Sequence, residues 1–291
     1  NEYVTVFKDF YKKVKRLKPD IIYVGGDIVH SKTQGISPEL IDNLISWFKS
    51  LGDICQTHVI LGNHDGLMHN KDRQDAITPI VSALNHPNVH LYKDSGVYQI
   101  DDTEFNLCVF SCFDEGNWDK VVPVEGMINI ALYHGAVRGS LTDTDWALEG
   151  EVNSSIFSKF EFALLGDIHK RQYLTKKKNV AYCGSTIQQN YGEDTEKGFL
   201  VWDIESATRF KSKFYKLINP HPFITIDWAG NSSSTLRSCE KYLDGARFRV
   251  RSSVPITQAE SKRISAELKH VKNAKEVVFK VESSFDVSKI N

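Results

Sequence analysis

Four segments of the chain share one pattern, an apolar run that ends in a polar corner marked by glycine. They are IIYVGGDIVH (21–30), HVILGNHD (58–65), INIALYHG (128–135) and FALLGDIHK (162–170). Consecutive apolar residues rich in Ile and Val are typical of strands that are covered on both faces. We therefore predict four buried strands whose polar residues meet at the C-terminal edge of a sheet, where open α/β folds bind ligands.

Between these runs, apolar residues recur at the spacing of amphipathic helices. We predict one helix over residues 4–17, a second over 38–50 and a short third helix before residue 85. Their expected inner faces are Val4, Phe7, Tyr11, Val14 and Leu17, then Leu40, Ile41, Leu44, Ile45 and Phe48, then Ile77, Ile80, Val81 and Leu84. A helix that leads into a doubly covered strand normally follows a parallel strand, so we expect the natural protein to begin before Asn1.

The other segments are less regular. Residues 88–113 alternate with period two around turn signals and predict mostly antiparallel strands. Residues 136–158 are polar, with Trp146 as the main apolar anchor, and 180–204 predict two strands that complete a two-sheet sandwich. From about Phe223 the pattern predicts a small α+β unit with three strands and one helix, in which 229–238 is a polar stretch.

The composition is that of a soluble globular protein. The 291 residues are 41% hydrophobic and 25% charged, and a net charge of −1 gives no sign of a nucleic-acid or membrane partner. The five cysteines form no CxxC pair, which favours buried free thiols in a reducing compartment. Because no segment resembles a membrane span or signal peptide, we expect a cytoplasmic or nuclear protein.

The first corner places Asp27 directly after two glycines. Glycines let the backbone turn, so the carboxylate can point into the crevice at the sheet edge. A carboxylate can bridge two cations, which two-metal hydrolytic sites hold roughly 4 Å apart. We interpret Asp27 as such a bridge, although an isolated Gly-Asp after a strand is also typical of a helix N-cap.

The second corner, GNHD, is dense in chemistry. Asn63 can bind a metal through its amide oxygen. His64 is then free to protonate a leaving oxygen or to stabilise charge on phosphorus, and Asp65 can fix the tautomer of His64. The alternative for all three residues is a polar turn.

The last two corners and the end of the first add three histidines and an aspartate. His134 ends its strand alone, and a lone histidine can equally be a hydrogen-bonded core residue. Asp167 and His169 point to one face if their strand continues, which favours a pair of ligands. His30 lies three residues beyond Asp27, where it can contact a phosphate or serve only as a turn residue.

Taken together, GGDIVH, GNHD, YHG and GDIHK resemble, in order and spacing, the later motifs of the calcineurin-like metallophosphoesterases. The loop after GNHD, residues 180–204 and the C-terminal unit are more narrowly similar to the SbcD family of DNA-repair nucleases. The resemblance implies an α/β (α+β) fold, a four-layer β-sandwich flanked by helices. It also implies two domains, a nuclease domain over 1–217 and a capping domain over 218–291 that helps to position DNA.

The same resemblance implies Mn²⁺-dependent cleavage of DNA ends by two divalent ions, with Mg²⁺ as the alternative metal. In that family pattern Asp27 bridges the ions and His64 acts on the transition state or as the acid. Asn63, His134 and Asp167 surround one ion, and His169 binds the other. The usual partner is an SbcC-type coiled-coil ATPase, and a homodimer formed through the first helices is a further family expectation.

Two departures from the family pattern change these expectations. The opening D-x-H motif, which supplies two ligands of the first ion, is missing, so a chain that truly began at Asn1 should be nearly inactive. The usual G-H-x-H reads Gly166, Asp167, Ile168, His169, and the additional carboxylate favours hard ions such as Mn²⁺ or Mg²⁺. The ATPase-binding segment of such nucleases would lie beyond Asn291.

Two alternative functions stay open. A phosphoesterase fold can hydrolyse small phosphodiesters or phosphomonoesters rather than DNA. It can also serve as a scaffold without catalysis that docks an ATPase or DNA, and the absent D-x-H motif favours that interpretation. Metal stoichiometry separates the scaffold from an enzyme, since two bound ions indicate catalysis.

Overall fold

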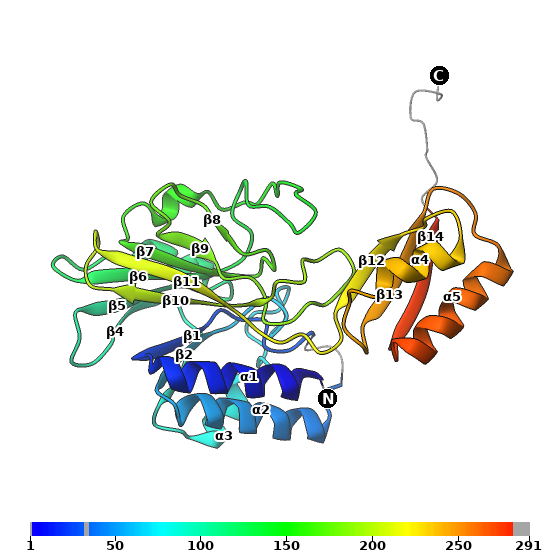
Figure 1. Ribbon diagram of the computed structural model, residues 1–291. Coiled ribbons are helices and arrows are strands. Elements are labelled where there is room, and N and C mark those ends of the chain that lie inside the picture. Colours follow the sequence, from blue (N-terminus) through cyan, green and yellow to red (C-terminus); the bar gives the residue numbers. More distant parts are fainter. Residues whose placement is uncertain (1, 32–34, 282–291) are drawn as a thin grey trace. The chain divides into compact units, whose positions relative to one another are not determined.

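The computed structural model describes residues 2–31 and 35–281 (Figure 1). These residues form two compact units. The larger unit comprises residues 8–185 and 198–216, and the smaller unit comprises 2–7, 186–197 and 217–281. The sequence predicted one division after residue 217, whereas the chain contributes two earlier segments to the smaller unit.

The larger unit begins with a three-stranded parallel sheet. Its strands are β1 (Ile21–Val24), β2 (Gln56–Ile60) and β3 (Val89–Tyr92), in that order. The helices α1 (Glu2–Leu17), α2 (Pro38–Gly52) and α3 (Thr78–Leu84) occur in this part of the chain (Figure 1). Side chains of α2 and α3 pack with β2 and β3 around Phe48, Val59 and Ile77.

The second sheet has six strands in the order β4-β5-β6-β7-β9-β8. Four central strands are parallel, and the edge strands β4 and β8 run antiparallel to their neighbours. The bounds are β4 (Gly96–Gln99), β5 (Phe105–Phe110), β6 (Ile128–His134), β7 (Phe162–Gly166), β8 (Gln172–Tyr173) and β9 (Val180–Tyr182).

The two sheets pack face to face. Ile60 of β2 lies in one buried cluster with Leu107, Leu132 and Phe162 of the six-stranded sheet. The hairpin β10 (Gly198–Ile204) and β11 (Phe210–Lys216) adds Trp202 and other side chains to this core. Two short 3₁₀ helices, η1 (Glu115–Lys120) and η2 (Ser154–Phe157), lie near the opposite face of the large sheet. The predicted mixed α/β sandwich is confirmed.

The prediction of mostly antiparallel strands in residues 88–113 was wrong. Only β4 and β5 pair in that way, because β3 joins β2 in parallel and β5 joins β6 in parallel. Period-two alternation reports that one face of a strand is more buried than the other, and it carries no information on strand direction.

Four apolar positions are also more exposed than expected. In α1, Val4 is 38% exposed, and Val6 is the buried residue of that turn. In α2, Leu40 is 36% and Ile41 37% exposed, because the buried stripe begins one turn later at Leu44. Trp146 is 72% exposed and does not anchor its segment. Val137, Phe157 and other buried side chains do so.

The smaller unit has a parallel sheet in the order β12-β13-β14. Its elements are β12 (Phe223–Asp227), α4 (Ser232–Cys239), β13 (Arg247–Ser252), α5 (Gln258–Val271) and β14 (Glu276–Val281). Helix α4 occupies most of the polar stretch 229–238, where no helix was predicted. Asn231 caps it by accepting a hydrogen bond from the Ser234 backbone N–H at 2.9 Å, and Cys239 buries its last turn.

The other two segments are held to this sheet by side chains. The carboxamide of Gln188 accepts a hydrogen bond from the Phe223 backbone N–H and donates one to its carbonyl oxygen, each at 2.9 Å. Arg247 forms an ion pair with Glu2 at 2.8 Å. The smaller unit is therefore assembled from three separate stretches of the chain.

All five cysteines are free, and Cys108, Cys112 and Cys239 are buried as predicted, whereas Cys183 is exposed. Among the described residues, no helix is long and apolar enough to cross a bilayer.

Candidate metal site

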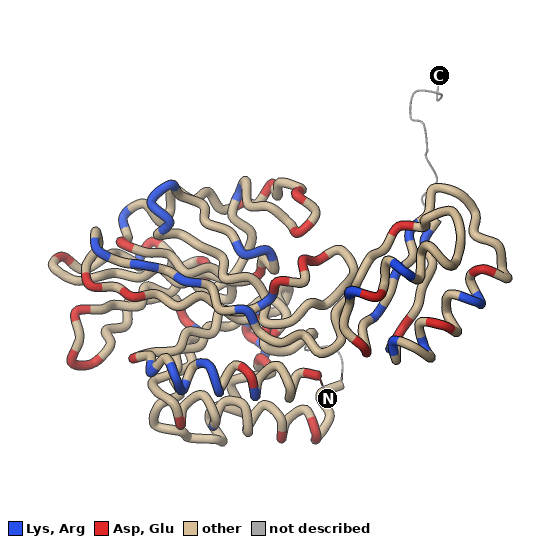
Figure 2. Tube along the Cα trace, in the orientation of Figure 1, with Lys and Arg blue, Asp and Glu red and all other residues tan. Residues whose placement is uncertain are grey.

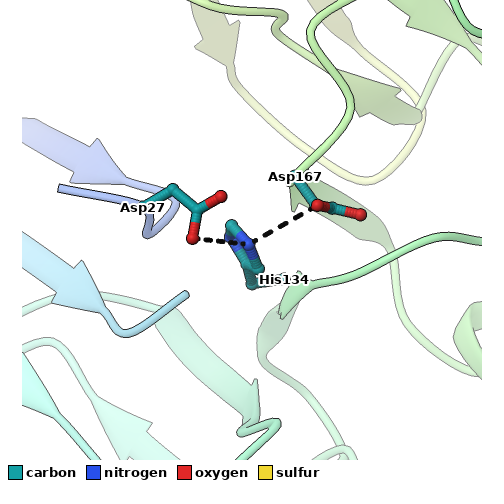
Figure 3. A group of neighbouring side chains, drawn as sticks. All are labelled: Asp27, His134 and Asp167. Atoms are coloured by element: carbon teal, nitrogen blue, oxygen red, sulfur yellow. Dashed lines mark ion pairs between the residues drawn. The ribbon is translucent and has the colours of Figure 1, made fainter. Parts of the chain in front are cut away.

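The carboxyl ends of the parallel strands bring three predicted ligands together (Figure 3). Asp27 follows β1, His134 is the last residue of β6, and Asp167 follows β7. Each offers one ligand atom, and these three atoms all lie within 4.8 Å of one another. The predicted convergence of strand ends is therefore present in the folded chain.

His134 is the centre of this cluster. Its Nε2 lies 3.2 Å from Oδ1 of Asp27 and 3.9 Å from Oδ1 of Asp167 (Figure 3). Oδ1 of Asn63, from the end of β2, lies 3.2 Å from the same nitrogen. Four of the five predicted metal ligands thus meet at one point, and the side chain of His134 is only 1% exposed.

The other ring nitrogen of His134 has a different partner. Nδ1 lies 2.6 Å from the Gly25 backbone oxygen, which can only accept a hydrogen bond, so Nδ1 carries the hydrogen. Nε2 of the neutral ring then directs a lone pair toward two carboxylates and an amide oxygen. Such a set of converging acceptors needs a proton or a cation between its members, and it therefore fits a metal ion.

The electrostatics of the cluster agree with this arrangement. Burial alone would lower the pKa of His134, but the adjacent Asp27 carboxylate outweighs it and raises the pKa. Burial would raise the pKa of Asp27, but His134 and the His64 backbone N–H together lower it. The pKa of Asp167 is raised, first by burial and also by the charge of Asp27. These shifts are typical of carboxylates crowded around a cation site.

Backbone contacts set the spacing of the corners. A Cβ atom on Gly166 would lie 1.9 Å from the Gly25 oxygen, so the ends of β1 and β7 can approach only because Gly166 has no side chain. Asp27 and Asp167 themselves have positive φ angles of 53° and 88°. Left-handed backbone costs a non-glycine residue about 1 kcal/mol, so two strained aspartates at one edge indicate a functional constraint.

His64 lies beside the cluster and is fixed through its backbone. Its N–H donates to Oδ1 of Asp27 at 3.0 Å. Its ring nitrogen Nδ1 hydrogen-bonds to the His30 backbone oxygen, and the rings of His30 and His64 stack with centroids 5.7 Å apart. His30 therefore orients His64, and Nε2 of His64 is the nitrogen that can meet a substrate.

Asp65 has a different role from the one predicted. It is fully buried, and its carboxylate accepts backbone hydrogen bonds from Gly62 at 2.8 Å, Ile28 at 2.8 Å and Val29 at 3.0 Å. Because His64 Nδ1 bonds to His30, the expectation that Asp65 fixes the tautomer of His64 is corrected. Asp65 instead ties the β2 corner to the β1 corner, and burial raises its pKa to about 6.

The strand that was expected to carry His169 ends earlier than predicted. Strand β7 ends at Gly166 and the backbone of Asp167 turns into the left-handed region, so the strand does not continue to His169. The premise of the i, i+2 ligand pair is therefore wrong. His169 still contributes to the electrostatic environment of Asp167, and its carbonyl oxygen accepts from the Ser185 backbone N–H at 3.3 Å.

Sequence reasoning missed two backbone contributions to this site. The Gly25 carbonyl oxygen orients His134, and the His64 N–H holds Asp27. The glycines at the corners were the available signal, because a backbone that approaches a side chain closely needs a residue without Cβ.

Two viral proteins are similar to this chain. R555 of Acanthamoeba polyphaga mimivirus, named as an uncharacterized protein, is 34% identical over 78% of the chain and 17% of its own length. The protein 244L of Invertebrate iridescent virus 6, a candidate phosphoesterase by its name, is 23% identical over 62% of the chain and 63% of its own length. The chain therefore matches less than two thirds of the length of each relative.

Comparison with protein-family models identifies the family to which the chain belongs. The model of the calcineurin-like phosphoesterases matches residues 2–159, more than half of the chain. This family uses divalent metal ions, in agreement with the donors that meet around His134. The chain belongs to the calcineurin-like phosphoesterase family.

Proposed function

We propose that the protein is a metal-dependent phosphodiesterase that cleaves DNA, with Mn²⁺ as its metal and a role in repair or recombination. The observation that carries phosphoester hydrolysis is the convergence of Asp27, Asn63, His134 and Asp167 at one sheet edge. Divalent ions held there would polarise the phosphodiester and supply a nucleophile at neutral pH.

The residues of this chain would contribute in distinct ways. Asp27 is held between His134 and the His64 N–H, which suits a bridging ligand. His64, supported by His30, would face the substrate and stabilise or protonate the leaving oxygen. His169 would belong to the second ion, and its approach to Asp167 supports that assignment.

Two features support a polynucleotide as the substrate. The side chains of Asp27 and Asp167 are 22% and 25% exposed, so the metal edge is open and suits a large substrate. In the smaller unit, Arg247, Arg249 and Arg251 alternate with buried residues along the central strand β13. They lie on the face of the sheet opposite the packed helices α4 and α5. Figure 2 shows the basic and acidic positions along the trace in blue and red.

Aromatic rings accompany these arginines. The guanidinium of Arg249 lies 5.1 Å from the centroid of the Tyr191 ring, and that of Arg247 lies 4.6 Å from the centroid of the Phe223 ring. Guanidinium groups and aromatic rings on one sheet face are typical of surfaces that bind nucleic-acid backbones and bases. Arg251, which pairs with Asp227 at 2.8 Å, is the exposed member of the three arginines. This supports the proposal that the smaller unit positions DNA. An SbcC-type ATPase partner and a homodimer stay predictions.

The test is the substitution His64→Ala, which removes the imidazole and keeps the N–H that holds Asp27. We expect metal binding to persist, while cleavage of linear duplex DNA in Mn²⁺ falls by about 100-fold or more. His270→Ala, at an exposed position of α5, is the matched control. Cleavage by His64→Ala at the parent rate would contradict the proposed role.

Two further measurements on the parent protein separate the alternative functions. A small-substrate phosphodiesterase would hydrolyse a nitrophenyl phosphodiester faster than DNA, whereas the proposed nuclease would prefer DNA. Calorimetry with Mn²⁺ on the full-length protein distinguishes both from a scaffold, because a scaffold would bind no ions.

A further inference from the structure

The larger unit has a hollow whose lining contains none of the residues assigned to the metal cluster. Its volume is about 520 Å³, within the range of small-ligand pockets. Its lining comes from η1, from the end of β6 and from the loop that follows β6. The lining residues are Glu115, Trp118, Tyr133, Ala136, Glu149, Gly150, Glu151 and Val152.

Tyr133 supplies a polar atom without a partner. The residue is 6% exposed, and its ring packs edge-on against Trp118 with centroids 5.6 Å apart. Within 2–31 and 35–281, its hydroxyl makes no hydrogen bond. The hydroxyl is not among the fully buried unpartnered polar atoms of the described residues, so it is open to solvent and available to a hydrogen-bonding ligand in the hollow.

The charge at this hollow is negative. Glu149 and Glu151 are exposed and form no ion pair with any described residue, while Glu115 pairs with Lys71 at 3.0 Å. Arg138 also reaches the lining, where its Nε donates to the Gly150 oxygen at 3.3 Å. Two carboxylates are thus available to a positively charged ligand.

The aromatic lining favours an organic cation over a metal ion. Trp118 donates its indole N–H to the Ser111 oxygen at 2.8 Å, so only its ring surface is available to a ligand. Cations bind such surfaces through the ring quadrupole. Among the described residues, the carboxylates here form no cluster with metal-ligand spacing, unlike the group around His134.

We propose that this hollow binds an organic cation, an alkylammonium or guanidinium group, between the Glu149 and Glu151 carboxylates, the Trp118 ring and the Tyr133 hydroxyl. Such a group meets all three features, because it carries charge, donates several hydrogen bonds and stacks on indole. Free polyamines and the Lys or Arg side chains of a polypeptide share this chemistry.

Calorimetry on the full-length protein tests the proposal with two probes, spermidine and an end-blocked Gly-Arg-Gly peptide. The matching citrulline peptide is the uncharged control. We expect saturable binding of at least one cationic probe, none of the citrulline peptide, and a loss of about tenfold or more in affinity in the double variant Glu149→Gln, Glu151→Gln. Tyr133→Phe should weaken binding by a smaller factor.

The double variant Glu104→Gln, Glu125→Gln is the matched control, because it removes the same charge from exposed positions of the larger unit outside the hollow. Binding of spermidine alone would assign the site to free polyamines, and binding of the peptide alone would assign it to a polypeptide side chain. If neither probe binds, or if both double variants bind equally, the proposal is overturned.

Discussion

Two sets of aspartates at neighbouring strand ends differ in how their oxygens are used. Asp27 and Asp167 are partly exposed, adopt left-handed backbone and face an imidazole that is itself an acceptor. Asp65 is fully buried and accepts three backbone hydrogen bonds. The carboxylate oxygens of Asp27 and Asp167 can therefore bind a cation, whereas those of Asp65 are occupied by hydrogen bonds from backbone N–H groups.

Residue type and position at a strand end therefore do not by themselves define a metal ligand. A carboxylate that saturates peptide N–H groups braces the corners, and one that meets other acceptors holds charge for a substrate or metal. Substitution of Asp27 or Asp167 should therefore lower activity, whereas substitution of Asp65, which braces the two corners, should lower the stability of the fold.

The largest expected effect is on catalysis at the metal edge. Asp27→Asn should lower hydrolysis of a nitrophenyl phosphodiester in Mn²⁺ by ~10³-fold, because the amide cannot bridge two cations. The free energy of unfolding in urea should change by less than about 1 kcal/mol, since a partly exposed side chain is replaced by an isostere. A large loss of stability in Asp27→Asn would show that Asp27, like Asp65, serves mainly to stabilise the fold.

Asp65→Asn should destabilise the fold by about 2–4 kcal/mol, measured by urea unfolding. The amide has one acceptor oxygen for three backbone donors, and its NH₂ group would face N–H groups. Normal stability combined with lost activity would contradict the brace and restore the predicted catalytic role of Asp65.

Imidazoles show the same contrast in their pH dependence. Asp27 raises the pKa of His134, whereas burial of His58 on β2 lowers its pKa to about 4. Between about pH 4 and pH 6.5, His58 is therefore neutral in the folded protein but protonated in the unfolded chain. The His58 contribution to stability should therefore fall as the pH drops below 6.5, by about 2 kcal/mol at pH 5.

Asp65 opposes this trend, because its pKa of about 6 in the folded state lets the native protein bind a proton first and gain stability as the pH falls toward 4. The His58 contribution is therefore read as the difference between the parent and His58→Gln in urea unfolding at pH 7.5 and pH 5. Parallel curves for the two proteins would show that His58 does not titrate in this way.

The smallest expected effect concerns the choice of metal. Asp167→His replaces a hard oxygen by an imidazole and should shift the ratio of Zn²⁺ to Mn²⁺ affinity by about tenfold toward Zn²⁺. Calorimetry with both ions on the parent and the variant measures the ratio. An unchanged ratio would place Asp167 outside the direct ligands.

Much of this site could be predicted from the sequence, because buried parallel strands have a recognisable pattern and their ends must meet. The strands that carry Asp27, Asn63, His134 and Asp167 follow that logic. The roles of Asp65 and His169 could not be predicted in this way. The role of Asp65 depends on which backbone N–H groups lie opposite its carboxylate, and that of His169 depends on where β7 ends. Helix α4 was missed because tertiary packing and the Asn231 cap sustain a helix with few apolar residues.

The three-part construction of the smaller unit bears on how the chain folds during synthesis. Gln188 bonds to Phe223, and Glu2 pairs with Arg247 across more than two hundred residues. Contacts of such long sequence separation form slowly. The N-terminal end of α1 must therefore wait until Arg247 has been synthesised before it finds its partner, while the donors around His134, all present by residue 167, can assemble well before.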